Sequence, residues 1–133
     1  YMVMRARAFV YATAPSPLIA SVVREALKLT ATHEDLRTRH AARVAHSGKL
    51  LAEACGIPLS GSHIQPVIVR HDQRALSLAT RMQDAGFDIR AVRPPTVPEG
   101  TARLRISFTL NVTDDDVKRM ADTLADALRE VSA

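Results

Sequence analysis

The stretch Arg93-Pro-Pro-Thr-Val-Pro-Glu-Gly-Thr-Ala-Arg-Leu-Arg-Ile-Ser-Phe108 joins a stiff loop to a segment of alternating side chains. Three prolines and one glycine restrict the backbone of its first half. In the second half, successive side chains of a strand point to opposite faces. Leu104 and Ile106 therefore share one face, and two arginines, Arg103 and Arg105, share the other. The pattern predicts a half-buried strand that directly follows a rigid loop.

Two guanidinium groups on one strand face admit two interpretations. A planar guanidinium binds a carboxylate or a phosphate through two parallel hydrogen bonds, so Arg103 and Arg105 can form an anion receptor. Charged side chains are also the ordinary occupants of a solvated strand face. Spacing alone leaves both interpretations open.

The composition describes one globular domain. The chain has 133 residues, of which 47% are hydrophobic and 24% charged, as in an ordinary domain with a buried core. The net charge is +4, but the arginines are dispersed and aromatic residues are few, which argues against nucleic acid as a partner. No apolar run reaches the roughly 18 residues of a membrane span, and a single cysteine, Cys55, fits a reducing compartment. We expect a cytoplasmic protein with no nucleic-acid or membrane partner.

Residues 57–133 alternate short apolar segments with amphipathic ones in the order β-α-β-β-α. Strands are expected at 64–69, 87–92 and 103–107, and Pro66 in the first of them predicts an edge position or a strand start. Asp72 is expected to cap the first helix and Gly86 to close it. Thr113, followed by three aspartates, is a strong start for the second. The fold class is therefore α/β (α+β), with two helices covering a three-stranded sheet.

The first 56 residues are expected to be a strand and two helices. The strand is the β-prone run Phe9-Val10-Tyr11. Ser16 and Pro17 form a good helix start, and that helix is expected to end near Leu29.

A long helix should follow from residue 33 or 34 to about Cys55, with Thr32 and Asp35 as its capping box and Gly56 at its end. Its exposed face is expected to carry Arg37, Arg39, His40, Arg43 and Lys49. Because its polar face is wide, we interpret it as a connector. The predicted division is 1–32 (strand and helix), 33–56 (connecting helix) and 57–133 (C-terminal domain).

Few side chains match a catalytic pattern. The five histidines lack metal-ligand spacing, and the acids at 114–116 fit a helix start. The sequence has no Gly-rich phosphate loop and no serine nucleophile elbow. Cys55 has no histidine partner by spacing, and none of the three lysines stands out as a Schiff-base residue. The residues alone predict no metal site and no catalytic group, and they identify no function.

A resemblance goes further than the residue pattern. The string at 93–106, together with Ser-His-Ile-Gln-Pro-Val-Ile-Val at 62–69, resembles the C-terminal part of the 8-amino-7-oxononanoate synthases. Residues 8–17, Ala-Phe-Val-Tyr-Ala-Thr-Ala-Pro-Ser-Pro, are similar as well, so the resemblance spans the whole chain. These synthases are α-oxoamine synthases, pyridoxal-phosphate (PLP) enzymes of the aspartate-aminotransferase-like fold type I. The resemblance implies the C-terminal third of such an enzyme, with residues 1–32 as the end of the large domain.

The resemblance also implies an activity and a set of site residues. The activity is the decarboxylative condensation of L-alanine with a pimeloyl thioester, either pimeloyl-CoA or pimeloyl-carrier protein, in biotin biosynthesis, with PLP as cofactor. By this resemblance Arg105 grips the amino-acid carboxylate, Thr96 lies near the substrate, and Thr13 reaches the PLP phosphate of the neighbouring subunit. Ala12 lacks the hydroxyl that the family carries there. The lysine that bonds PLP has no counterpart in this chain, so the chain alone is expected to be inactive, with no catalytic residue of its own.

Two functions stay open at this point. One is the C-terminal part of an oxononanoate synthase, an acyltransferase that works only with its large domain. The other is a freestanding, non-catalytic domain that binds a carboxylate ligand or a protein partner through the same surface. In the family, residues 1–30 pack on the large domain and the dimer partner. We therefore expect a homo-oligomer, or a chain that a large domain completes.

Overall fold

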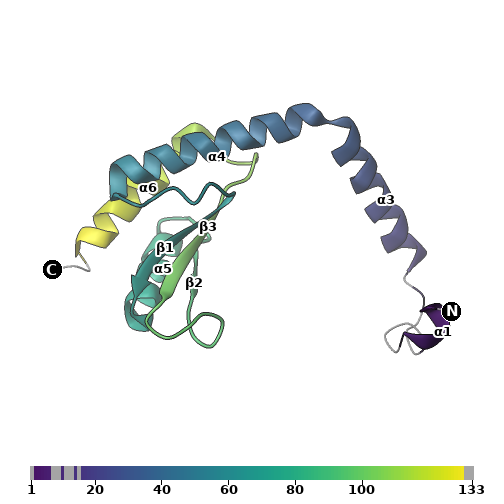
Figure 1. The fold of residues 1–133 in the computed structure, drawn as a ribbon. Helices are drawn as coiled ribbons and strands as arrows, with labels where there is room; N and C mark the ends of the chain where they lie inside the picture. Colours follow the sequence, from purple (N-terminus) through teal and green to yellow (C-terminus); the bar gives the residue numbers. More distant parts are fainter. Residues whose placement is uncertain (1, 7–9, 11–13, 15, 131–133) are drawn as a thin grey trace. The chain divides into compact units, whose positions relative to one another are not determined.

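The computed structural model describes residues 2–6, 10, 14 and 16–130, and these form two compact units. The first unit covers Tyr1–Leu36 and the second Arg37–Ala133 (Figure 1). Helices α1 (Met2–Arg5) and α3 (Pro17–Thr32) lie in the first unit, and α4 (Glu34–Cys55) begins there and continues into the second. Within the described residues, none of the helices is both long enough and apolar enough to cross a bilayer.

Helix α3 starts where the sequence predicts and ends later. It begins at Pro17 directly after Ser16, although the Ser16 hydroxyl makes no capping hydrogen bond. The predicted end near Leu29 is wrong. The hydroxyls of Thr30 and Thr32 donate to carbonyls one turn earlier, at 2.8 Å in both cases, and the helix continues through Thr32. Thr32 is thus the last residue of α3, and the capping box predicted for the next helix is wrong.

Of the other two elements predicted for the first 56 residues, the strand is not tested and the long helix is confirmed. The strand expected at residues 9–11 lies, apart from Val10, outside the described residues. The long helix is confirmed as α4, and it ends at Cys55 before Gly56, whose φ of +67° favours glycine. The division of the chain at residues 32 and 56 stays a prediction.

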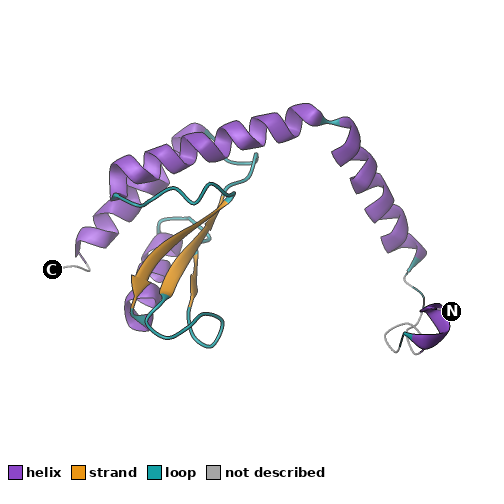
Figure 2. Cartoon of the chain, in the orientation of Figure 1, coloured by secondary structure: helices purple, strands orange, loops and turns teal. Residues whose placement is uncertain are grey.

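The second unit contains an antiparallel sheet in the order β1-β3-β2 (Figure 2). Its strands are β1 (Ile64–Arg70), β2 (Arg90–Val92) and β3 (Ala102–Ser107). The edge position predicted from Pro66 is confirmed, since β1 pairs with β3 alone. Strand β2 is three residues shorter than predicted. The backbone N–H of Phe87 donates to the Met82 carbonyl at the end of the preceding helix, so this segment is still turning.

Two helices, α5 (Asp72–Asp84) and α6 (Asp114–Glu130), complete the β-α-β-β-α order that the sequence predicts. Helix α5 contacts all three strands, and α6 contacts α5. The N-cap position of α5 belongs to His71 and not to Asp72, which is the first helical residue. Gly86, with φ of +91°, closes α5 as predicted.

The core lies between one face of the sheet and these helices. It contains Val67, Val69, Leu78, Met82, Leu104, Ile106, Val117, Met120 and Leu124, joined by Leu51 from α4. Burial of Leu104 and Ile106 confirms the predicted alternation along β3. Arg105 belongs to the opposite face of the sheet, where its side chain is exposed.

Candidate functional site

The register of the strands gathers three arginines on the open face of the sheet. Arg105 lies opposite Pro66 of β1 and opposite Arg90 of β2. Residues directly opposite each other in antiparallel strands share a face. Arg103, two residues before Arg105, belongs to the same face. The sequence predicted Arg103 and Arg105 there, but it gave no signal for Arg90, whose pairing partner is fifteen positions later in the chain.

The three arginines differ in their partners. The Nε of Arg90 donates to an Asp88 carboxylate oxygen at 2.8 Å. The Nε of Arg103 donates to the Thr101 carbonyl at 2.9 Å. Arg105 is exposed, and within the described part of the chain it has neither a hydrogen bond nor an ion pair. It is therefore the guanidinium of this face that is free to receive an anion.

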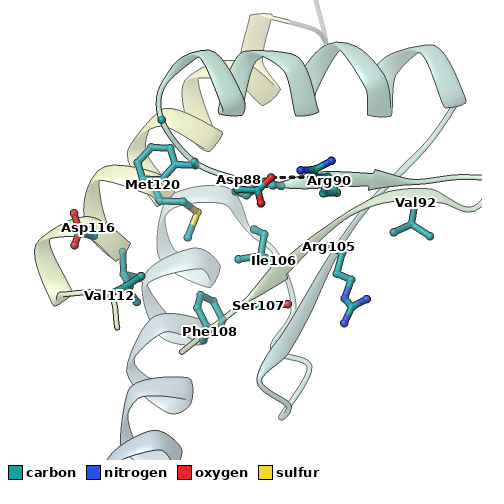
Figure 3. A pocket seen from close by; sticks show the side chains of 14 residues that line it. Asp88, Arg90, Val92, Arg105, Ile106, Ser107, Phe108, Val112, Asp116 and Met120 are labelled. Atoms are coloured by element: carbon teal, nitrogen blue, oxygen red, sulfur yellow. Dashed lines mark hydrogen bonds and ion pairs between the residues drawn. The ribbon is translucent and has the colours of Figure 1, made fainter. Parts of the chain in front are cut away.

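A cavity of about 490 Å³ lies beside Arg105, at the start of β2, where β3 continues past Arg90 and pairs with β1 only (Figure 3). Its charged lining comes from Asp88, Arg90, Arg105 and Asp116. The apolar lining consists of Phe87, Ile89, Val92, Ile106, Phe108, Val112, Val117 and Met120. Figure 3 shows the arginines at the strand end of this cavity, and Val112, Asp116 and Met120 at the end formed by α6.

Helix α4 is hydrogen-bonded to the segment that connects β3 to α6, and residues of this segment line the cavity. His40 donates from Nε2 to the Phe108 carbonyl at 3.0 Å. Arg43 donates to the Val112 carbonyl at 2.7 Å, and it pairs with Asp114 at 3.1 Å. Both carbonyls belong to residues that line the cavity.

His40 and Arg43 were expected on the exposed face of the long helix, and this prediction is wrong. Both side chains are partly buried. Their partners lie 68 and 69 positions further along the chain, so the periodicity of a single helix could not identify them.

Thr96 occupies a different surface from Arg105. It is exposed in the proline loop, where its backbone N–H donates to the Arg93 carbonyl at 3.0 Å. It lines a second cavity of about 470 Å³ together with residues 91–95. Val92 lines both cavities. Thr13, the predicted phosphate contact, lies outside the described residues, and the site roles of Thr13, Thr96 and Arg105 stay predictions.

The described residues fit a carboxylate better than they fit a cofactor or a metal ion. No lysine lines the cavity beside Arg105, so this surface offers no amine to hold PLP covalently. In the part of the chain that the structure describes, no cluster of histidine, cysteine and acidic side chains could bind a metal ion. The Cys55 thiol is half-buried and lies 3.5 Å from the Ala121 carbonyl; burial raises its pKa, so it is protonated at neutral pH.

Comparisons with known proteins agree with the resemblance seen in the sequence. No protein-family model matches the chain. An 8-amino-7-oxononanoate synthase from Saccharophagus degradans is 39% identical over 133 residues, which cover 98% of this chain and 33% of that protein. The synthase from Methylocella silvestris is 37% identical, over 96% of the chain and 35% of its own length. The chain thus spans about a third of the length of these curated relatives.

Solved structures share the fold at lower identity. The 8-amino-7-oxononanoate synthase from Francisella tularensis superposes with a TM-score of 0.80 at 22% identity, over 100% of this chain and 39% of that one. A serine palmitoyltransferase from S. paucimobilis with a bound PLP–myriocin aldimine gives a TM-score of 0.84 at 20% identity, over 95% of this chain and 32% of that one. The fold is that of the C-terminal domain of fold-type I PLP enzymes. Nearly the whole chain is similar to a stretch that makes up about one third of the length of the 8-amino-7-oxononanoate synthases.

Proposed function

We propose that this chain is the C-terminal part of an 8-amino-7-oxononanoate synthase of biotin biosynthesis. The reaction is the decarboxylative condensation of L-alanine with a pimeloyl thioester, and PLP is the cofactor. The observation that carries the proposal is Arg105, an exposed guanidinium without a partner among the described residues. It belongs to a chain that is 39% identical to a named synthase.

In this proposal Arg105 holds the carboxylate of the amino acid. A guanidinium offers two parallel N–H groups that match the two oxygens of a carboxylate, so it fixes orientation as well as position. Strand β3 supplies a rigid base for it, because Leu104 and Ile106 on either side are buried in the core. Arg105 therefore binds and orients the substrate, and none of the lysines of this chain is assigned to the covalent bond with the cofactor.

The remaining assignments are carried by the resemblance. Thr96 would lie near the substrate, and Thr13 would reach the PLP phosphate of a neighbouring subunit in a homo-oligomer. The acyl donor is pimeloyl-CoA or pimeloyl-carrier protein, and a cytoplasmic location fits both. The alternative of a freestanding carboxylate-binding domain is not favoured, because similarity to the synthases extends over nearly the whole chain.

A domain exchange tests the function. The chain would replace the matching third of the Saccharophagus degradans synthase, and the chimera would be assayed with PLP, L-alanine and pimeloyl-CoA. We expect release of CO2 and formation of the amino-oxo acid. Arg105→Gln in the chimera should raise the KM for alanine by about tenfold to a hundredfold, since it removes hydrogen bonds between charged groups.

Arg39→Gln is the matched control, because it removes the same charge from an exposed position of α4 outside the cavity. A chimera that binds PLP but releases no CO2 would contradict the proposed activity. An unchanged KM in the Arg105 variant would contradict the carboxylate assignment alone.

A further inference from the structure

We propose that Arg90 is a second anion-binding residue that acts on the same carboxylate as Arg105, and that Asp88 limits the affinity by competing for Arg90. The inference rests on the proposed function and deepens it, because it adds a residue and a built-in competitor to the carboxylate site. It comes from the register of β2 and β3 and from one ion pair.

The register places the two arginines opposite each other, although Figure 3 shows Arg90 turned to Asp88 and Arg105 extending away from that ion pair. Arg90 and Arg105 are direct partners across β2 and β3. Side chains in this relation share a face, with their Cβ atoms about 4.5–5.5 Å apart. Both arginines also line the 490 Å³ cavity. Both side chains are long and exposed, so a rotation of the Arg90 side chain would let it share a carboxylate bound by Arg105.

The charges around this pair are unbalanced. Like charges directly opposite each other in a sheet are destabilising. The Asp88 carboxylate pairs with Arg90 at 2.8 Å, and Arg105 keeps no partner among the described residues. Asp116, the other acid of the cavity lining, pairs with Arg119 at 3.2 Å, so Arg105 is left without a counter-charge among the described residues. An incoming carboxylate would supply the missing negative charge and share both arginines with Asp88.

A purely structural role for Arg90 and Asp88 makes a different prediction. Their side chains are 75% and 76% exposed, and a surface ion pair of this kind contributes little to folding. Variants at either position should therefore fold. If the ion pair only stabilised β2, loss of Arg90 and loss of Asp88 would both weaken anion binding. If Asp88 competes with the ligand, loss of Arg90 weakens anion binding and loss of Asp88 strengthens it.

The experiment is a titration of the chain with acetate, followed through the NMR signals of the arginine Nε–H groups. Arg90→Gln should weaken acetate binding by about threefold to fivefold, in the range of an exposed charge pair. Asp88→Asn should strengthen it by about threefold, because it frees Arg90. Asp88→Asn should lose this effect when Arg90 is already Gln, since Asp88 acts through Arg90.

The controls separate this inference from the proposed function. Arg39→Gln should bind acetate like the parent chain, and it corrects for net charge. Arg105→Gln should abolish the shifts. If it does so while Arg90→Gln and Asp88→Asn bind like the parent chain, or both weaken binding, the role of Arg90 is overturned and the proposed function stands. If Arg105→Gln binds like the parent chain, the carboxylate site itself is wrong.

Discussion

Arg105 differs from its neighbouring arginines in its partners rather than in its position on the strand. Arg90 has Asp88, Arg103 has a backbone carbonyl, and Arg105 has none among the described residues. An exposed guanidinium is well solvated, so the fold does not depend on satisfying it. The packing of β3 therefore does not explain an arginine at this position, whereas the proposed contact with a carboxylate would.

A second residue-scale feature is the cap of α6, formed by Thr113 and Asp116. The Asp116 N–H donates to the Thr113 hydroxyl at 3.1 Å, and the Thr113 hydroxyl and backbone N–H donate to the Asp116 carboxylate at 2.6 and 3.1 Å. The hydroxyl hydrogen bond is the main cause that lowers the pKa of Asp116, followed by the backbone one. This reciprocal arrangement satisfies two backbone groups at the helix start.

The cap predicts a pH-dependent stability. Since the pKa of Asp116 is lower in the folded state, the unfolded chain binds the proton first as the pH falls. The stabilisation is present above the unfolded pKa of about 4 and is lost as the pH falls through the folded value. In Thr113→Ala the pKa of Asp116 should rise towards its ordinary value. The variant should also lose about 1 kcal/mol of unfolding free energy at pH 7.

Carbon-detected NMR titration of Asp116 measures the pKa, and urea unfolding at pH 7 and pH 3 measures the stability. Thr123→Ala is the matched control, because its hydroxyl also bonds within α6, to the Arg119 carbonyl, but lies away from the cap. An unchanged pKa of Asp116 in Thr113→Ala would refute this account of the cap.

At the scale of elements, Arg43 ties α4 to the connection between β3 and α6. Its side chain is only 19% exposed and bonds to the Val112 carbonyl and to Asp114. Arg43→Met keeps most of the apolar stem and removes these bonds. We expect a loss of about 1–3 kcal/mol in unfolding free energy, because a charged hydrogen bond is removed and the Val112 carbonyl loses its donor.

The measurement is urea unfolding, with Arg39→Met as control, since Arg39 is exposed on the same helix. Val112 lines the cavity beside Arg105, so acetate binding should weaken in Arg43→Met as well. Equal unfolding free energies for the two variants would show that the connection does not depend on Arg43.

Elements whose signals are local could be predicted from the sequence, and those that depend on distant partners could not. The start of α6 at Asp114 and the end of α5 before Gly86 rest on neighbouring residues, and both predictions are confirmed. The roles of His40 and Arg43 depend on carbonyls 68 and 69 residues away, and the predictions for them are wrong. The candidate site divides in the same way: alternation along β3 predicted that Arg103 and Arg105 share a face, and the resemblance singled out Arg105, but only the register reveals Arg90.

At the scale of the whole molecule, α3 presents apolar side chains that the described part of the chain does not bury. None of its residues is buried, and Leu18, Val22 and Leu29 are 72%, 59% and 53% exposed. These three lie on one side of the helix, because they are spaced by four and seven residues. A contiguous apolar surface of this kind is typical of an interface.

We therefore predict that the isolated chain self-associates through α3. Val22→Glu places a charge in the middle of the apolar stripe, and burying that charge unpaired should raise the dissociation constant at least about tenfold. Light scattering over a range of concentrations measures it. Ser21→Glu adds the same charge on the polar side of α3, beside Arg24 and Lys28 in the helical projection, and should leave association unchanged. A monomer at high concentration, or equal effects of the two variants, would mean that this stripe is not an interface between copies of the chain.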